Sequence, residues 1–305
     1  MNIIRAENIA KTFGDVNALR SLSLSVEEGE LFGLVGPDGA GKTTCIRILT
    51  SIMETTSGDA WVNGFHVGRE PEQVKEQIGY MCQKFALYPD LTVQENLDFY
   101  ANLYGIPTSM RATRYTEVLS FSNLHPFRNR QSAFLSGGMK QKLALACALV
   151  HTPRILFLDE PTNGVDPISR RDFWRILTQL RAQGVTLFVS TAYLDEAERC
   201  SRIGLFHEGR LLATGTPDEL RKLMEGTLLE IRTRHAREAM GRLKQVFPPE
   251  SVTLFGDRIH LATENPEMTR VLLDRILPHE QFELQNIRTI QPSLEDVFVS
   301  IISAR

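Results

Sequence analysis

The sequence predicts an α/β domain built around a phosphate-binding loop, followed by a small α+β domain. A glycine-rich segment at residues 36–43 stands between a short apolar strand and a segment with helical spacing. An apolar strand at 154–159 ends abruptly in the acidic pair Asp159-Glu160. Strands and helices then alternate after residue 222. Carboxylates at the end of a buried parallel strand are typical of the ligand-binding edge of an α/β sheet.

The glycine-rich segment, Gly-Pro-Asp-Gly-Ala-Gly-Lys-Thr, fits the pattern G-x-x-x-x-G-K-[ST] at every constrained position. Its glycines allow backbone N–H groups to curl around anionic oxygens, which a Cβ would obstruct. The strand expected at 30–35 and the helix expected at 44–53 would place the phosphates at a helix N-terminus. Lys42 would supply a positive charge and Thr43 a hydroxyl for Mg²⁺. The expected nucleotide-binding residues are Gly36, Pro37, Asp38, Gly39, Ala40, Gly41, Lys42, Thr43 and Thr44.

The two acids have separate expected roles. Asp159 ends its strand at the crevice where ligands bind, so it can reach Mg²⁺ through water. Glu160 lies one residue further on, where it can polarise a water that attacks the γ-phosphate of ATP.

A third motif, Leu-Ser-Gly-Gly-Met at 135–139, precedes a helix expected at 139–150. With these motifs in this order, residues 1–220 resemble the nucleotide-binding subunit of an ATP-binding cassette (ABC) transporter. The resemblance implies that Ser136, Gly137 and Gly138 face an ATP molecule bound by a second cassette, to which they present a hydroxyl, N–H groups and a helix dipole. The ATP site would therefore be composite.

Further positions follow from the same resemblance. Phe13 matches the aromatic residue that stacks on adenine. Gln83 matches a glutamine whose amide oxygen touches Mg²⁺ or the attacking water, in a loop that faces the membrane partner. Residues 163–166 match the D-loop, with Val165 where leucine is usual. The implied metal-binding residues are Thr43, Gln83 and Asp159.

Position 192 departs from the family pattern. After the strand expected at 186–190 the family has a histidine that contacts the γ-phosphate, whereas this chain has Ala192. A methyl group cannot donate a hydrogen bond. Three accounts remain open: a site degenerate for hydrolysis, an engineered substitution that traps ATP, or catalysis that rests on Glu160 alone. Asp38, where asparagine is common, is a smaller departure, because a carboxylate near phosphates is electrostatically unfavourable.

Composition restricts the class of protein. The four cysteines are scattered without a C-x-x-C pair, which favours a reducing cytosol over a disulfide framework. The net charge of −3 gives no electrostatic case for nucleic acid as a partner. The longest apolar run, 143–150, is too short to span a bilayer, and the N-terminus has no signal-peptide pattern. Together with the resemblance to an ABC transporter subunit, this implies a cytoplasmic protein held at the inner face of the plasma membrane by a permease.

The cassette is expected at 1–222, with a helical subdomain at about 84–150. Thr92 can cap a helix at 93–104, and Pro107 interrupts the helical pattern. In the family this subdomain carries the groove that receives the coupling helices of the permease. Four aromatic residues could anchor such a contact: Phe85, Tyr88, Phe99 and Tyr100.

Residues 223–305 are expected to form a second domain with the ferredoxin-like order β-α-β-β-α-β-α. The expected strands lie at 228–233, 252–255, 258–262 and 282–289, and the helices at 237–246, 266–277 and 293–302, the last capped by Ser293. The ending at 292–298 is similar to the C-termini of ATPase subunits in ABC-2-type drug and lipid exporters. A regulatory or dimer-stabilising domain and a plain structural extension are both compatible with this pattern.

These observations predict an ATPase subunit that powers an ABC-2-type exporter through ATP-driven dimerisation of two cassettes and hydrolysis. ATP and Mg²⁺ are the expected cofactors, and a transmembrane permease is the expected partner. The second cassette would be an identical chain, a different chain or the other half of a tandem protein. The alternatives are a soluble, non-transport ABC ATPase and a nucleotide-sensing module with little turnover.

Overall fold

The computed structural model describes residues 2–84 and 86–303. The chain forms two compact units, Met1–Thr214 and Gly215–Arg305. Helix α8 (Pro217–Arg221), which the sequence assigns to the end of the cassette, lies in the second unit and contacts α12 (Leu294–Ser303) there. Phe85 lies outside the described residues.

The main sheet of the first unit has the strand order β10-β9-β3-β8-β7-β6. Its three central strands are buried at every residue and pair in parallel. Their apolar runs reflect this burial, because a parallel sheet is covered on both faces. The strands are β3 (Leu31–Val35), β6 (Ile78–Met81), β7 (Ile155–Asp159), β8 (Thr186–Thr191), β9 (Arg202–His207) and β10 (Arg210–Gly215).

A second sheet in the same unit is antiparallel, with the order β2-β1-β4-β5. Helix α1 (Lys42–Leu49) contacts β7 of the main sheet and β2 and β4 of the second sheet, so it lies between them. The two sheets and α1 share one hydrophobic core. The strands are β1 (Asn2–Phe13), β2 (Val16–Glu27), β4 (Ser57–Val62) and β5 (Phe65–His66).

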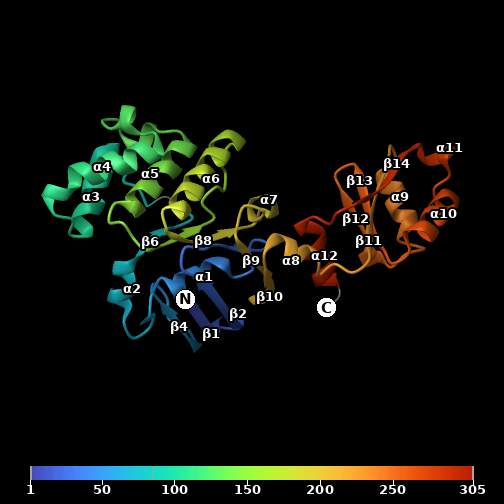
Figure 1. Ribbon diagram of the computed structural model, residues 1–305, viewed down its shortest axis with the longest axis horizontal. Helices are drawn as coiled ribbons and strands as arrows, with labels where there is room; N and C mark the ends of the chain where they lie inside the picture. Colours follow the sequence, from blue (N-terminus) through green and yellow to red (C-terminus); the bar gives the residue numbers. More distant parts are fainter. Residues whose placement is uncertain (1, 85, 304–305) are drawn as a thin grey trace. The chain divides into compact units, whose positions relative to one another are not determined.

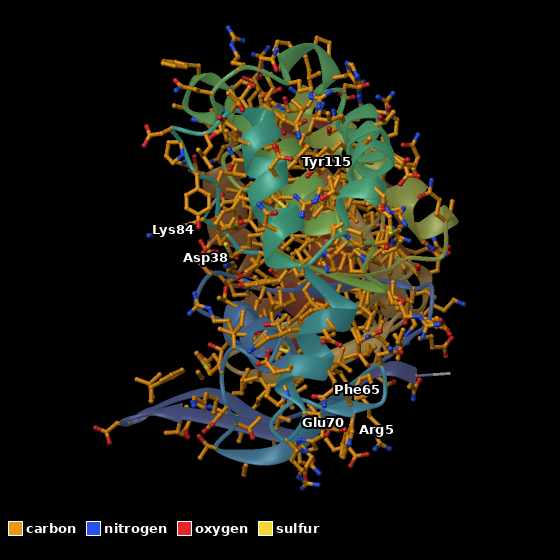
Figure 2. The ribbon with its side chains drawn as sticks, turned by 90° about the vertical axis from the view of Figure 1, so that its left-hand side faces the viewer. Arg5, Asp38, Phe65, Glu70, Lys84 and Tyr115 are labelled. Atoms are coloured by element: carbon orange, nitrogen blue, oxygen red, sulfur yellow. The ribbon has the colours of Figure 1, made fainter. Side chains whose placement is uncertain are left out.

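Helices α3 (Val93–Leu103), α4 (Thr108–Ser122) and α5 (Gly137–Leu149) form one group, which Figure 1 shows beside α6 (Pro167–Ala182). Thr92 caps α3 as expected, with a capping box completed by Glu95. Tyr115 of α4 is buried inside this group (Figure 2). Short helices α2 (Pro71–Gln77) and α7 (Leu194–Ala197) complete the unit. Among the described residues, no helix has the length and apolar character that a membrane crossing requires.

Two of the aromatic residues proposed for a permease contact are less available than expected. Phe99 lies 4.4 Å from Tyr88 and 5.5 Å from Tyr100 between ring centroids, and the Tyr100 hydroxyl donates to the carbonyl of Ala86. Phe99 and Tyr100 are therefore half-buried in a local cluster, while Tyr88 remains exposed.

The second unit confirms the ferredoxin-like order. Its strands β11 (Thr227–Thr233), β12 (Val252–Phe255), β13 (Arg258–Thr263) and β14 (Leu284–Ile290) form an antiparallel sheet with the order β12-β13-β11-β14. Helices α9 (Ala236–Leu243) and α10 (Pro266–Ile276) occupy the two crossovers. Phe282 differs from expectation: it ends a short helix, α11 (His279–Phe282), because Glu283 adopts a left-handed conformation and delays the strand.

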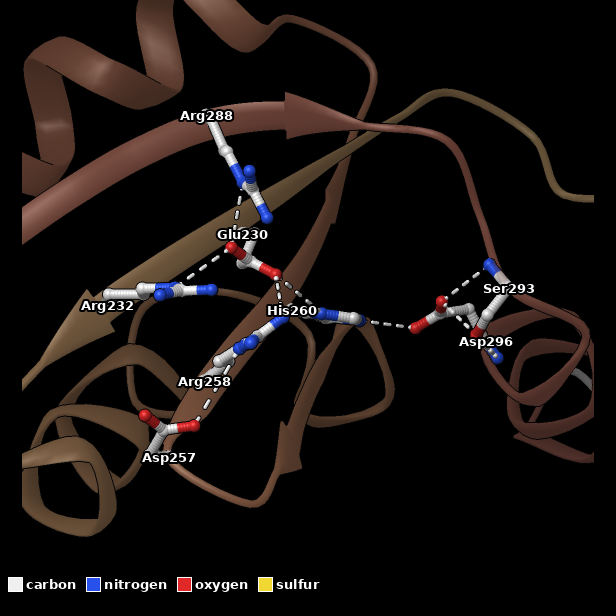
Figure 3. Close-up of polar contacts among 8 residues, drawn as sticks. All are labelled: Glu230, Arg232, Asp257, Arg258, His260, Arg288, Ser293 and Asp296. Atoms are coloured by element: carbon white, nitrogen blue, oxygen red, sulfur yellow. Dashed lines mark hydrogen bonds and ion pairs between the residues drawn. The ribbon is translucent and has the colours of Figure 1, made fainter. Parts of the chain in front are cut away.

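Three arginines converge on one buried carboxylate in this sheet, as Figure 3 shows. Glu230 of β11 accepts hydrogen bonds from Arg288 (2.8 Å), Arg232 (3.2 Å) and Arg258 (3.2 Å). On the neighbouring strand, His260 Nδ1 lies 2.6 Å from Asp296 Oδ1 of α12.

Candidate functional site

The phosphate loop joins β3 to α1 as the sequence predicts, although α1 begins two residues earlier than expected and ends at Leu49. Gly41 has φ 104°, and a Cβ there would lie 2.4 Å from the carbonyl oxygen of Ala18. Only glycine fits this position. The Lys42 ammonium is buried and donates to the carbonyls of Gly36 (2.7 Å) and Pro37 (3.0 Å). The loop borders a cavity of about 440 Å³ that Gly39, Gly41, Lys42, Thr43 and Thr44 help to line.

Asp159 stands at the end of β7 beside the start of α1. Its Oδ1 accepts hydrogen bonds from Thr43 Oγ1 (3.1 Å) and Ser190 Oγ (2.7 Å). Its Oδ2 is buried without a hydrogen-bond partner among the described residues. Burial raises the pKa of Asp159, and the hydrogen bonds from Ser190 and Thr43 offset only part of this effect.

These features fit a magnesium ion. A buried carboxylate oxygen without a donor is an unfavourable arrangement that a cation relieves. Carboxylate and hydroxyl oxygens are ligands that Mg²⁺ accepts, often through water. Thr43, the last residue of the phosphate loop, and Asp159 lie together as the sequence predicts.

Glu160 is held in an unusual backbone conformation. Its φ is 47°, in the left-handed region, where a residue with a side chain is strained. Its N–H group donates to Ser190 O (3.2 Å) and Ser190 Oγ (2.9 Å) and thereby fixes the turn. Ser190 therefore supports both acids of the motif.

The Glu160 side chain brings three predicted segments together. Its Oε1 lies 3.1 Å from Lys42 Nζ. Its Oε2 accepts hydrogen bonds from Gln83 Nε2 (2.8 Å) and from Asn163 Nδ2 at the start of the D-loop (3.3 Å). Three segments far apart in the sequence, which hold Lys42, Gln83 and the turn with Glu160 and Asn163, thus meet at the carboxyl ends of β3 and β7, where an α/β sheet binds ligands.

The signature segment begins α5. Ser136 is the N-cap of this helix, and its hydroxyl accepts from the N–H of Met139 (3.3 Å), so Gly137 and Gly138 lie in the first helical turn. A Cβ on Gly138 would lie 2.4 Å from Ser169 Oγ of α6, which explains the glycine. Within the part of the chain that the structure describes, no hydrogen bond or ion pair joins residues 136–138 to the phosphate loop.

The remaining predicted residues are Phe13, Asp38 and Ala192. Phe13 ends β1 and is 46% exposed, as a residue that stacks on a ligand must be. Asp38 is exposed, and Figure 2 shows it at the edge of the first unit. Ala192 follows β8 and shares a cavity of about 150 Å³ with Asp38, Glu160 and Asn163. Position 192 therefore faces the same space as Glu160.

Comparison with known families gives two matches. Residues 19–163 match the family described as ABC transporter, and residues 215–302 match the ATP-binding protein DrrA1-3-like, C-terminal domain. The linearmycin resistance ATP-binding protein LnrL of Bacillus subtilis is 32% identical over 98% of this chain and 98% of its own length. The chain belongs to the ABC transporter ATP-binding family. Proteins of this family are ATPases that couple ATP hydrolysis to transport.

Other ABC proteins resemble the first unit. The probable multidrug ABC transporter ATP-binding protein YbhF of Escherichia coli is 42% identical over 219 residues, which are 72% of this chain and 38% of YbhF. The chain therefore spans well under half the length of that relative. The dimeric, post-hydrolysis ATP-binding cassette MJ0796 bound to ADP and Pi superposes with a TM-score of 0.64 at 26% identity, over 70% of this chain and 98% of that one. The ABC cassette fold is thereby confirmed.

Ser190 contributes to this site, although the sequence predicts it only as the end of a strand. The signal for Ser190 was its place at the end of a buried strand, like Asp159, but the pairing of β7 with β8 that joins the two residues is a property of the fold.

Proposed function

We propose that this chain is the ATP-binding and ATP-hydrolysing subunit of an ABC-2-type exporter, held at the cytoplasmic face of the membrane by a permease. Two similarities support the proposal. LnrL, which matches nearly the whole chain, is a linearmycin resistance ATP-binding protein. The second unit matches the DrrA-like C-terminal domain. We infer a regulatory or dimer-stabilising role for this unit.

The convergence of Lys42, Gln83 and Asn163 on the Glu160 carboxylate is the observation that carries the proposed chemistry. The loop N–H groups and Lys42 hold the β- and γ-phosphates. Thr43, Asp159 and Gln83 hold Mg²⁺, which neutralises phosphate charge when bound. Glu160 accepts a proton from the attacking water, and Phe13 stacks on adenine.

The proposed ATP site needs a second cassette. Ser136, Gly137 and Gly138 lie at the N-terminus of α5, where the helix dipole and free N–H groups favour an anion. No bond ties them to the phosphate loop of the same chain, so we assign them to the γ-phosphate of a partner. The dimeric cassette MJ0796 supports such an assembly.

Replacing Lys42 tests the phosphate loop. A charge-assisted contact contributes about 1.5–3 kcal/mol, so Lys42→Ala should weaken ATP binding by about 10- to 100-fold in titration calorimetry. Lys75→Ala, which removes a surface lysine paired with Glu72, is the matched control and should bind ATP normally. Equal ATP affinity of Lys42→Ala and the parent chain would refute the assignment.

A nucleotide-sensing module with little turnover is a second candidate, favoured by the methyl group of Ala192 in the cavity beside Glu160. Measuring the single-turnover rate together with the dissociation constant separates the two. Tight ATP binding with no conversion to ADP over hours supports the module, whereas steady turnover that Glu160→Gln abolishes supports the ATPase.

A further inference from the structure

Glu196 of α7 is a buried acid with no role in the chemistry described so far. Its side chain is 1% exposed. Its Oε1 accepts a hydrogen bond from Thr162 Oγ1 (2.5 Å), and its Oε2 accepts one from Thr191 Oγ1 (2.8 Å). Burying a carboxyl group is unfavourable unless its oxygens are hydrogen-bonded, and here both oxygens are.

The two threonines belong to the two segments that flank the reacting centre. Thr162 lies two residues after Glu160, in the turn that follows β7. Thr191 is the last residue of β8 and directly precedes Ala192. The Thr191 hydroxyl also accepts from the N–H of Tyr193 (3.0 Å). One carboxylate therefore ties the Glu160 turn to the loop at position 192.

Arg170 adds a third connection. Its Nε lies 3.4 Å from Glu196 Oε1, and its guanidinium stacks over the ring of Tyr193 at 4.3 Å. Arg170 lies in the first turn of α6, next to Ser169, whose side chain packs against Gly138 of the signature helix. Glu196 is thus joined to the helix that supports the signature segment as well as to the two loops.

We propose that Glu196 is a positioning residue for ATP hydrolysis: it holds the Glu160 turn in register with the loop at position 192. The inference rests on the proposed role of Glu160. A left-handed residue such as Glu160 persists only where its surroundings hold it there, and the bond from Thr162 to Glu196 is one of the constraints on its turn. Small displacements of a catalytic group lower a rate strongly without weakening substrate binding.

Two substitutions test the proposal. Glu196→Gln keeps the shape of the side chain but replaces one of the two accepting oxygens with an NH₂ group, which cannot accept the hydrogen bond from a threonine hydroxyl. Glu196→Ala removes the hydrogen bonds to both threonines. Single-turnover ATP hydrolysis with protein in excess should slow by about 10-fold in the first and about 100-fold in the second. The ATP dissociation constant should stay within about threefold of the parent value, because Lys42 and the loop are untouched. Parent rates in Glu196→Gln with a folded protein would overturn the proposal, and this variant decides if Glu196→Ala fails to fold.

A double-mutant cycle tests the route of the effect. Thr162→Val removes one hydroxyl that Glu196 holds. If Glu196 acts through this bond, Thr162→Val should slow hydrolysis on its own, and the double variant should be little slower than Glu196→Gln. Multiplicative rate losses would mean that the two residues act independently, and the proposed route would be wrong.

Glu30 offers a matched control for general destabilisation. It is also buried, accepts a hydrogen bond from the N–H of Glu27 (2.7 Å) and pairs with Arg202 (3.3 Å), at the start of β3 rather than at its catalytic end. Glu30→Gln should lower the melting temperature and leave the hydrolysis rate unchanged. If Glu30→Gln slowed hydrolysis as much as Glu196→Gln does, Glu196 would have only a structural role.

Failure of the inference is distinguishable from failure of the proposed function. If Glu160→Gln hydrolyses ATP at the parent rate, the role of Glu160 is wrong and the inference falls with it. If Glu160→Gln is inactive while Glu196→Gln turns over at the parent rate, only the inference fails.

Discussion

Lys42 Nζ lies 3.1 Å from Glu160 Oε1, and both side chains are almost fully buried. The same ammonium donates to the carbonyls of Gly36 and Pro37. Phosphate oxygens need this ammonium too, so ATP has to replace the carboxylate as its partner. The ion pair therefore links Lys42, which is proposed to bind phosphate, to Glu160, which is proposed to accept a proton from the attacking water.

Glu160→Gln should have opposite effects on the free and the ATP-bound protein. Without ATP the melting temperature should fall, because removing one partner of a buried ion pair leaves the other uncompensated. ATP should bind about 10-fold more tightly, or about 1.4 kcal/mol, because a negative charge beside the γ-phosphate is removed. Calorimetry measures both quantities. Glu72→Gln, at an exposed surface pair, is the control, and an unchanged ATP affinity in Glu160→Gln would contradict the competition.

Asp159→Asn should stabilise the protein without ATP and remove its response to Mg²⁺. The raised pKa of Asp159 means that folding favours the protonated carboxyl group. The protonated carboxyl group of Asp159 therefore stabilises the fold fully below its unfolded pKa of about 3.8. This stabilisation is lost as pH rises through the higher folded pKa, where the carboxyl group becomes charged. The variant should unfold at a higher temperature than the parent at pH 7 and at the same temperature below pH 4.

The Mg²⁺ arm of this test uses the same melting curves. The parent should be stabilised more by ATP with Mg²⁺ than by ATP with a chelator, whereas Asp159→Asn should show no such difference. A variant that keeps the full Mg²⁺ effect would exclude Asp159 from the metal site.

Ser136→Arg should prevent ATP-induced dimers while leaving ATP binding by one chain nearly intact. The bulky cation would occupy the space proposed for the partner's γ-phosphate, and Ser136 has no bond to the phosphate loop of its own chain. Light scattering with ATP measures the dimer. Ser120→Arg, at an exposed position of α4 in the same group of helices, is the control. The same ATP-induced dimer in Ser136→Arg would refute the role across two chains.

The sequence predicts that Lys42, Gln83 and Glu160 belong to one site, and the structure brings these side chains together, but several contacts around them are not predicted. Lys42 and Glu160 were recognisable because each lies in a short motif whose spacing reflects its chemistry. The contacts of Ser190 and Glu196 were not, because they depend on which strands are neighbours: Ser190 reaches Asp159 only because β8 pairs with β7.

The ends of helices and strands are also predicted less well than the presence of these elements. Glu283 adopts a left-handed conformation that delays the last strand by two residues, and a glutamate gives no local signal for such a conformation. The order of the second domain was nevertheless predicted correctly, because its alternating patterns are local to each strand and helix.

Glu230→Gln should weaken the second unit at neutral pH. Burial alone would raise the pKa of Glu230, but hydrogen bonds from Arg288 and Arg232 and the charge of Arg258 more than offset this and lower it. The charged carboxylate of Glu230 therefore stabilises the fold above its unfolded pKa of about 4.5. This stabilisation is lost as pH falls through the lower folded pKa. The expected loss is about 1–3 kcal/mol, the scale of hydrogen bonds to a charged group, because the arginines shown in Figure 3 are part-exposed and stay hydrated.

Hydrogen exchange of the full chain measures this loss locally. Amides of β11 and β13 should exchange faster in Glu230→Gln at pH 7. Glu295→Gln, at an exposed position in the first turn of α12, should leave them unchanged. Unaltered protection in both variants would mean that the three arginines stabilise the sheet without Glu230.

Ala192→His should raise the rate of ATP hydrolysis by about one to three orders of magnitude. The methyl group of Ala192 cannot donate to a phosphate, whereas the cavity of about 150 Å³ that it shares with Glu160 has room for an imidazole ring. One positioned donor at a developing charge contributes on this scale. Free imidazole tests the same space without a mutation: added to the parent chain, it should raise the rate in a saturable way. Glu160→Gln on top of Ala192→His should remove the gain, because the histidine positions what the glutamate polarises. A parent chain that releases phosphate as fast as Ala192→His, and that imidazole does not stimulate, would mean that catalysis rests on Glu160 without a donor at position 192.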